Sequence, residues 1–120
     1  MLIDSLTGPR PLAPALRRAI DKRERLLVPS IVFYEWLRGP RTQQELTAQE
    51  ALFPGETAIV FGWQEAVVSA KLYRSLRRPR GREIDIAIAA CAISRDAELW
   101  TLNVADFKDI TGLRLYCYTD

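Results

Sequence analysis

The stretch GREIDIAIAACAISR, residues 81–95, decides how this chain folds. A helix over residues 83–95 has apolar side chains nearly all round, and a helix of that kind belongs in the middle of a fold. A break at Pro79-Arg80-Gly81 precedes it, and two acids, Glu83 and Asp85, stand at its start. The other elements are therefore expected to pack around this helix.

Candidate strands and helices alternate on both sides of that segment. We expect helices over residues 11–25, 31–38, 42–53 and 63–78, a helical turn at 105–109, and strands over 26–28, 57–61, 99–102 and 113–118. Ser30 is a candidate helix cap, and Thr42 with Glu45 has the capping-box spacing. Alternating strands and helices predict right-handed βαβ units in an α/β fold with a parallel sheet. A chain of 120 residues predicts one domain, residues 1–120.

The composition excludes several kinds of chemistry. The sequence contains no histidine, which excludes His-based acid–base catalysis, His-ligated zinc and the Ser-His-Asp arrangement. Cys91 and Cys117 lie far apart in apolar surroundings, as thiols do in a reducing compartment, and their spacing does not support a disulfide. Residues 1–11 lack the features of a secretory signal, and no apolar run approaches a membrane span. We therefore expect a cytoplasmic protein without a membrane partner.

Polar residues follow the predicted strands, at the edge where parallel sheets place their functional crevice. Glu35 lies in the helix after strand 26–28, Asp85 opens the central helix, and Asn103 and Asp106 follow strand 99–102. Oxygen ligands without His or Cys suit Mg²⁺ or Mn²⁺. The shared location of these residues therefore favours a metal site.

Each of these residues also has an ordinary interpretation. Glu35, taken alone, is better explained by an i,i+3 pair with Arg38 on a solvated helix face. Asp85 suits the first turn of a helix, where the dipole favours negative charge, and Asn103 can cap the turn that follows it. Single residues therefore leave the choice open.

Positive charge is concentrated just before the central helix, although the net charge is only +2. Five arginines occupy nine positions there: Arg74, Arg77, Arg78, Arg80 and Arg82. Such a patch can hold phosphates. It also suits a solvated helix end, where cations complement the dipole, and the two interpretations are equally supported.

Three segments together resemble the downstream motifs of PIN-domain toxins of the VapC family: VPSIVFYEWLRGP, RRPRGREIDIAIAACAI and LWTLNVADFKDITGLRL. The resemblance runs through nearly the whole chain. It implies a PIN-like three-layer α/β/α fold with a central parallel sheet flanked by helices, and acids that hold Mg²⁺ or Mn²⁺. It also implies cleavage of RNA, often tRNA, together with homodimerisation and inhibition by a small cognate antitoxin. By position, the family's second and third acids fall on Glu35 and Asp85, and its fourth acidic region falls on Asn103 and Asp106.

The N-terminal segment MLIDSLTG departs from that pattern. The family begins with a strand ending in an aspartate, followed by an apolar segment that often reads VLID. Residues 1–4 resemble this later segment, and the spacing from Asp4 to Glu35 fits. The central strand and first aspartate would then lie upstream of Met1, leaving a truncated domain. A competing alignment makes residues 1–3 the strand and Asp4 the first metal-binding acid.

The resulting hypothesis is a metal-dependent endoribonuclease. Glu35 and Asp85 would bind the metal, and Asp106 with Asn103 would position a second metal or the attacking water. Arg80 and Arg82 would guide the RNA backbone.

Aromatic side chains near the site are candidates for stacking on bases: Tyr34, Trp36 and Trp100. Core packing is the better interpretation for Trp100.

A catalytically inactive PIN-like module that binds antitoxin or RNA is the main alternative, which a missing first acid favours. A receiver-like signalling domain also clusters acids at strand ends, but the spacing of the later motifs argues against it.

Overall fold

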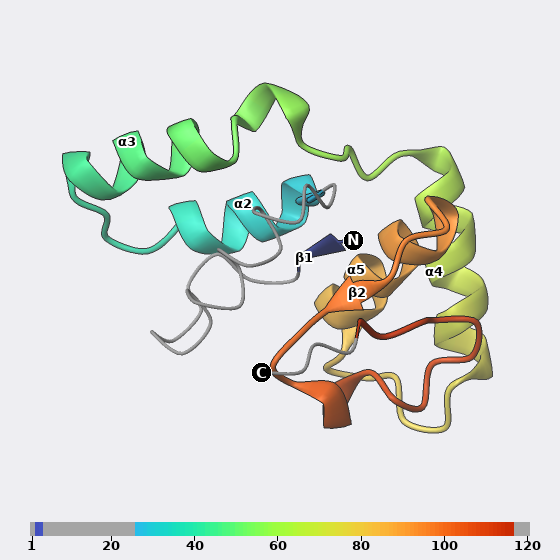
Figure 1. The fold of residues 1–120 in the computed structure, drawn as a ribbon. Helices are drawn as coiled ribbons and strands as arrows, with labels where there is room; N and C mark the ends of the chain where they lie inside the picture. Colours follow the sequence, from blue (N-terminus) through green and yellow to red (C-terminus); the bar gives the residue numbers. More distant parts are fainter. Residues whose placement is uncertain (1, 4–25, 117–120) are drawn as a thin grey trace.

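The structure is a computed structural model that describes residues 2–3 and 26–116 (Figure 1). Two short parallel strands lie at its centre: β1 (Leu2–Ile3) and β2 (Leu99–Trp100). Leu2 stands opposite Leu99 and Ile3 opposite Trp100. All four side chains are buried, so this pair forms part of the hydrophobic core.

Isolated parallel bridges continue this pair outward on both sides. They join Leu2 to Leu27, Pro29 to Ile59, and Leu99 to Leu115. The predicted parallel arrangement is therefore confirmed, and each of the four predicted strand segments takes part in it. The segments are shorter than predicted: among the described residues, 57–61 and 113–118 each contribute a single bridged residue.

β1 occupies the central position of this arrangement, with a parallel neighbour on each side. The backbone N–H of Leu2 donates to the carbonyl of Glu98 at 2.7 Å, and that of Ile3 donates to the carbonyl of Leu27 at 2.9 Å. The expectation that the chain lacks its central strand is therefore wrong, because the short apolar run at residues 2–3 pairs on both edges. Asp4 lies outside the described residues; the extent of the domain and the missing first acid stay predictions.

The helices agree with the sequence to within about one turn. They are α2 (Ser30–Leu37), α3 (Gln43–Leu52), α4 (Trp63–Ser75) and α5 (Glu83–Ser94), with single 3-10 turns at Gly55–Thr57 and Val104–Asp106. The predicted helix over 11–25 lies outside the described residues. Thr42 and Glu45 form the predicted capping box at the start of α3. Ser30 is not the cap of α2, because Pro29 holds that position without a side-chain hydrogen bond.

Helix α5 is the core helix that its composition predicts. Its residues 86–92 are all buried, and it packs mainly against α4 and also against α2. The small side chains Ala89, Ala90 and Ala92 are fully buried. Figure 1 shows α3 and α4 at opposite ends of the view, with β1 and β2 between them. None of the helices described here is long and apolar enough to cross a membrane.

Candidate active site

Asp85 lies at the start of α5, directly after the turn that leads into this helix. Gly81 has φ +86°, a backbone conformation that residues with a Cβ atom rarely adopt. This conformation lets the chain reverse into the helix. Arg82 is the N-cap: its N–H donates to the carbonyl of Pro79 at 3.0 Å, and its own carbonyl accepts from Ile86 at 2.9 Å. Asp85 therefore lies in the first turn of α5, half-buried, where the helix dipole favours a carboxylate.

The loop after β2 presents Asn103 and Asp106. Buried Thr101 accepts a hydrogen bond from the N–H of Asn103 at 2.9 Å, and the carbonyl of Asn103 accepts from the N–H of Asp106 at 2.9 Å. Buried Phe107 and Ile110 anchor the following residues in the core. Asn103 caps the turn without a side-chain hydrogen bond, so its amide and the Asp106 carboxylate remain exposed.

These two segments bring Asp85 and Asp106 within electrostatic range of one another. Burial raises the pKa of Asp85, the negative charge of Asp106 raises it further, and the charge of Arg82 opposes both effects. Two carboxylates that repel one another become favourable neighbours when a cation lies between them. Oxygen donors of this kind match Mg²⁺ and Mn²⁺, which take one or two carboxylates and keep several waters. The residues present therefore fit a hard divalent cation.

Arg82 is engaged within the protein. Its Nη1 and Nη2 donate to the two carboxylate oxygens of Asp109, at 2.9 Å and 2.7 Å, and Nη2 also donates to the backbone carbonyl of Asp106 at 2.8 Å. These hydrogen bonds raise the pKa of Arg82 and lower that of Asp109. Asp109 was not singled out from the sequence, although its position three residues after Asp106, on the same turn-forming segment, is a usable signal.

Glu35 has a different neighbour. It is half-buried on α2, and its carboxylate lies 3.9 Å from Arg38 Nη2, one turn further along the helix. This is the ordinary i,i+3 pairing that the sequence allowed. Within the described ranges, no group of three or more Asp, Glu, His or Cys residues is close enough to share a metal ion. The structure thus brings Asp85 and Asp106 together and leaves Glu35 paired elsewhere.

The aromatic candidates differ in accessibility. Tyr34 is 60% exposed, with the Arg38 guanidinium 5.7 Å from its ring centroid. Trp36 is buried, and Arg41 covers its ring at 4.3 Å. Trp100 is buried beside Tyr116, as core packing predicts. Of the three, only Tyr34 offers a ring to a base.

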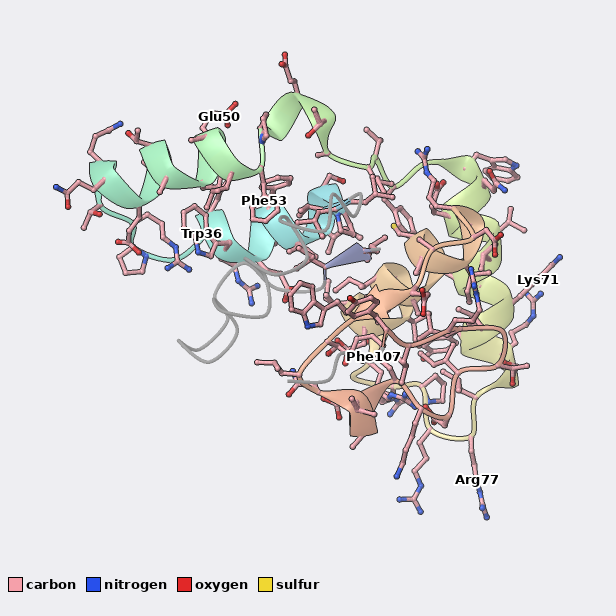
Figure 2. All side chains as sticks on the ribbon, viewed as in Figure 1. Trp36, Glu50, Phe53, Lys71, Arg77 and Phe107 are labelled. Carbon is pink, nitrogen blue, oxygen red and sulfur yellow. The ribbon has the colours of Figure 1, made fainter. Side chains whose placement is uncertain are left out.

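The arginines before Arg82 are accessible. Arg77, Arg78 and Arg80 are exposed, and they form no ion pair with any other residue in 26–116. Figure 2 shows Arg77 extending away from the body of the molecule. A flexible cationic side chain of this kind is available to a phosphate backbone, whereas the Arg82 guanidinium is already paired with Asp109.

Comparisons with known proteins agree on one family. The PIN domain family matches residues 1–113. Ribonuclease VapC19 of Mycobacterium tuberculosis, strains CDC 1551 and H37Rv, is 35% identical over 114 residues, covering 93% of this chain and 90% of the relative.

Two solved structures share the fold. One is VapBC2 from Rickettsia felis bound to a DNA fragment from its promoter, with TM-score 0.72 and 21% identity over 99% of this chain and 100% of that one. The other is VapBC-1 from nontypeable Haemophilus influenzae, with TM-score 0.69 and 26% identity over 97% of each chain. The chain therefore belongs to the PIN domain family and is a member of its VapC type.

Proposed function

We propose that this protein is a metal-dependent endoribonuclease that hydrolyses RNA phosphodiester bonds. The observation that carries the proposal is the convergence of Asp85 and Asp106, from the start of α5 and the loop after β2, in a VapC-type PIN domain. The similarity to a protein named ribonuclease VapC19 supports RNA as the substrate.

Asp85 and Asp106 hold the cation, Mg²⁺ or Mn²⁺, and Asn103 orients water beside them. When bound, the metal lowers the pKa of a water molecule and offsets negative charge on the phosphate. Asp4 follows β1 in the sequence, and we propose it as a further ligand. Glu35 joins the site by leaving Arg38, an exchange that costs little because the pair is long and partly exposed.

Exposed arginines before α5 hold the RNA backbone. Arg80 keeps the role that the sequence predicted for it, and Arg77 and Arg78 share it.

Both similar structures are VapBC complexes, which supports a small antitoxin as the partner that neutralises this chain. We also propose a homodimer.

Cleavage of a mixed RNA substrate with Mg²⁺ or Mn²⁺ tests the proposal. The wild-type chain should cut, and EDTA or Asp85→Asn should abolish cutting. Asp96→Asn is the matched control, because Asp96 is an exposed acid that pairs with Arg114 instead. An Asp85→Asn variant that cuts at the wild-type rate would refute the assignment.

An inactive binding module is the second candidate, favoured by the absence of a three-acid group within the described ranges. Asp4→Asn addresses it: loss of cutting would identify Asp4 as the first acid. A wild-type chain that binds an antitoxin but cuts no RNA under any metal condition would establish the binding module instead.

A further inference from the structure

Arg82 joins the two segments that carry the paired acids. Its backbone is fixed as the N-cap of α5, three residues before Asp85. Its guanidinium spans to the loop after β2, where it binds both carboxylate oxygens of Asp109 and the backbone carbonyl of Asp106. Three hydrogen bonds from one rigid fork therefore connect the helix start to the loop that carries the second acid, two of them to Asp109 and one to Asp106 itself.

The environment of this pair distinguishes it from an ordinary surface ion pair. Arg82's side chain is only 22% exposed, and Asp109's is 53% exposed. The chain also offers a comparison, since Arg114 binds the carboxylate and the carbonyl of Asp96, but those side chains are 58% and 95% exposed. Freely exposed pairs contribute little, whereas a bidentate, partly buried arginine restricts the geometry of both segments.

We propose that Arg82 and Asp109 are a positioning pair, which holds Asp106 at the distance from Asp85 that a divalent cation requires. The inference rests on the proposed function and assigns Arg82 to the metal site's framework instead of to RNA. Asp109 has a second effect in this arrangement. By occupying the guanidinium, it prevents Arg82 from turning onto Asp85 or Asp106, both within its electrostatic reach, and competing with the metal.

The positioning effect of Arg82 and the effect of its charge predict opposite changes in metal affinity when Arg82 is replaced. A nearby positive charge opposes cation binding, so its removal should strengthen binding if charge were its whole effect. Loss of the three hydrogen bonds releases the Asp106 loop, which should weaken binding. Supporting contacts around metal ligands typically contribute about 10- to 100-fold in metal affinity, so the positional effect should prevail.

Mn²⁺ binding, measured by electron paramagnetic resonance or calorimetry without RNA, separates the two effects. Arg82→Lys, Arg82→Gln and Asp109→Asn should each weaken Mn²⁺ binding by about tenfold or more. Arg114→Gln and Asp96→Asn are the matched controls and should stay within about twofold of wild type. The Arg82→Gln/Asp109→Asn double variant should bind no more weakly than the weaker single variant, because the residues act as a pair.

Two results would overturn the proposal. If Arg82→Gln tightens Mn²⁺ binding and Arg82→Lys leaves it unchanged, Arg82 acts through charge alone. If all three variants bind Mn²⁺ like wild type and the Michaelis constant for RNA rises, Arg82 contacts RNA as the sequence first suggested. Arg82→Lys keeps both the charge and most of the local volume, so it decides the question even if Arg82→Gln does not fold.

The outcome is separable from that of the proposed function. Wild-type cutting that Asp85→Asn abolishes would uphold the ribonuclease, even where the Arg82 and Asp109 variants overturn the positioning pair. A wild-type chain that neither binds Mn²⁺ nor cuts RNA would overturn both.

Discussion

Asp106 lies close enough to Asp85 that the negative charge of the Asp106 carboxylate adds to the effect of burial in raising the pKa of Asp85. The two residues are brought together by different elements, the loop after β2 and the first turn of α5. The fold therefore maintains an electrostatically unfavourable pair. Such an arrangement is common where a site has been shaped for a ligand at some expense of stability.

Asp85→Asn is expected to stabilise the metal-free protein. The folded-state pKa of Asp85 is raised, so its contribution to stability falls as pH rises from the ordinary value through the raised one, and the full penalty is present at pH 7. Because solvent screens a half-exposed side chain, we expect a gain of about 0.5 kcal/mol, or about 2 °C in Tm.

Thermal unfolding in EDTA at pH 7 and at pH 3 measures this gain. The difference between Asp85→Asn and wild type should disappear at pH 3, where the carboxyl is protonated in both states. A variant that unfolds below the wild-type temperature at pH 7 would show that the Asp85 charge is favourably paired in the fold.

Leu2→Ala tests the central position of β1. Leu2 is fully buried between Leu27 and Leu99, so truncation should cost about 2–5 kcal/mol of unfolding free energy. Leu52→Ala makes the same chemical change on α3, where Leu52 is 58% exposed, and should cost under about 0.5 kcal/mol. Urea unfolding of both variants gives the comparison; equal costs would mean that β1 is not part of the core.

Cys91 is expected to resist alkylation in the folded protein. Burial raises the pKa of its thiol to about 11, with a further contribution from the negative charge of Glu65. At pH 8 only about one thiol in a thousand is then ionised, and the side chain is fully buried. In a Cys117→Ser background, iodoacetamide should label Cys91 only on unfolding. Rapid labelling at pH 8 without denaturant would show that α5 opens locally.

Structural features that depend on a local sequence pattern were predicted correctly. The apolar run in α5 and the Thr42–Glu45 capping box are short-range features, and both appear as expected. Prediction failed where distant partners decide. Two residues, Leu2 and Ile3, are too few to show periodicity, and only their pairing on both edges makes them the central strand.

The same distinction applies to the candidate site. Asp85 and Asp106 follow recognisable strand and helix ends, so sequence reasoning could find them. The partner of Arg82 could not be found that way, because Asp109 is 27 residues away and its role depends on how the loop after β2 folds back. Nothing in the sequence around a run of arginines distinguishes a solvated arginine from one that is paired with a distant acid.

That distinction between arginines leads to a prediction about salt. Arg77, Arg78 and Arg80 are exposed, and Arg82 is already neutralised by Asp109. In an Asp85→Asn background, which leaves RNA uncut, replacing all three exposed arginines by alanine should weaken RNA binding and lower the slope of log affinity against log salt by about 2, given about 0.7 per phosphate contact on single strands.

The controls are Arg82→Gln and Arg114→Ala in the same background, and neither should change that slope by more than about 0.5. Arg82→Gln removes a charge that is already paired with Asp109, so no counterion is released there when RNA binds. Fluorescence anisotropy across a salt series measures all four proteins. An unchanged slope in the triple variant would place the RNA on another face, whereas a shallower slope for Arg82→Gln would return Arg82 to the RNA-binding surface.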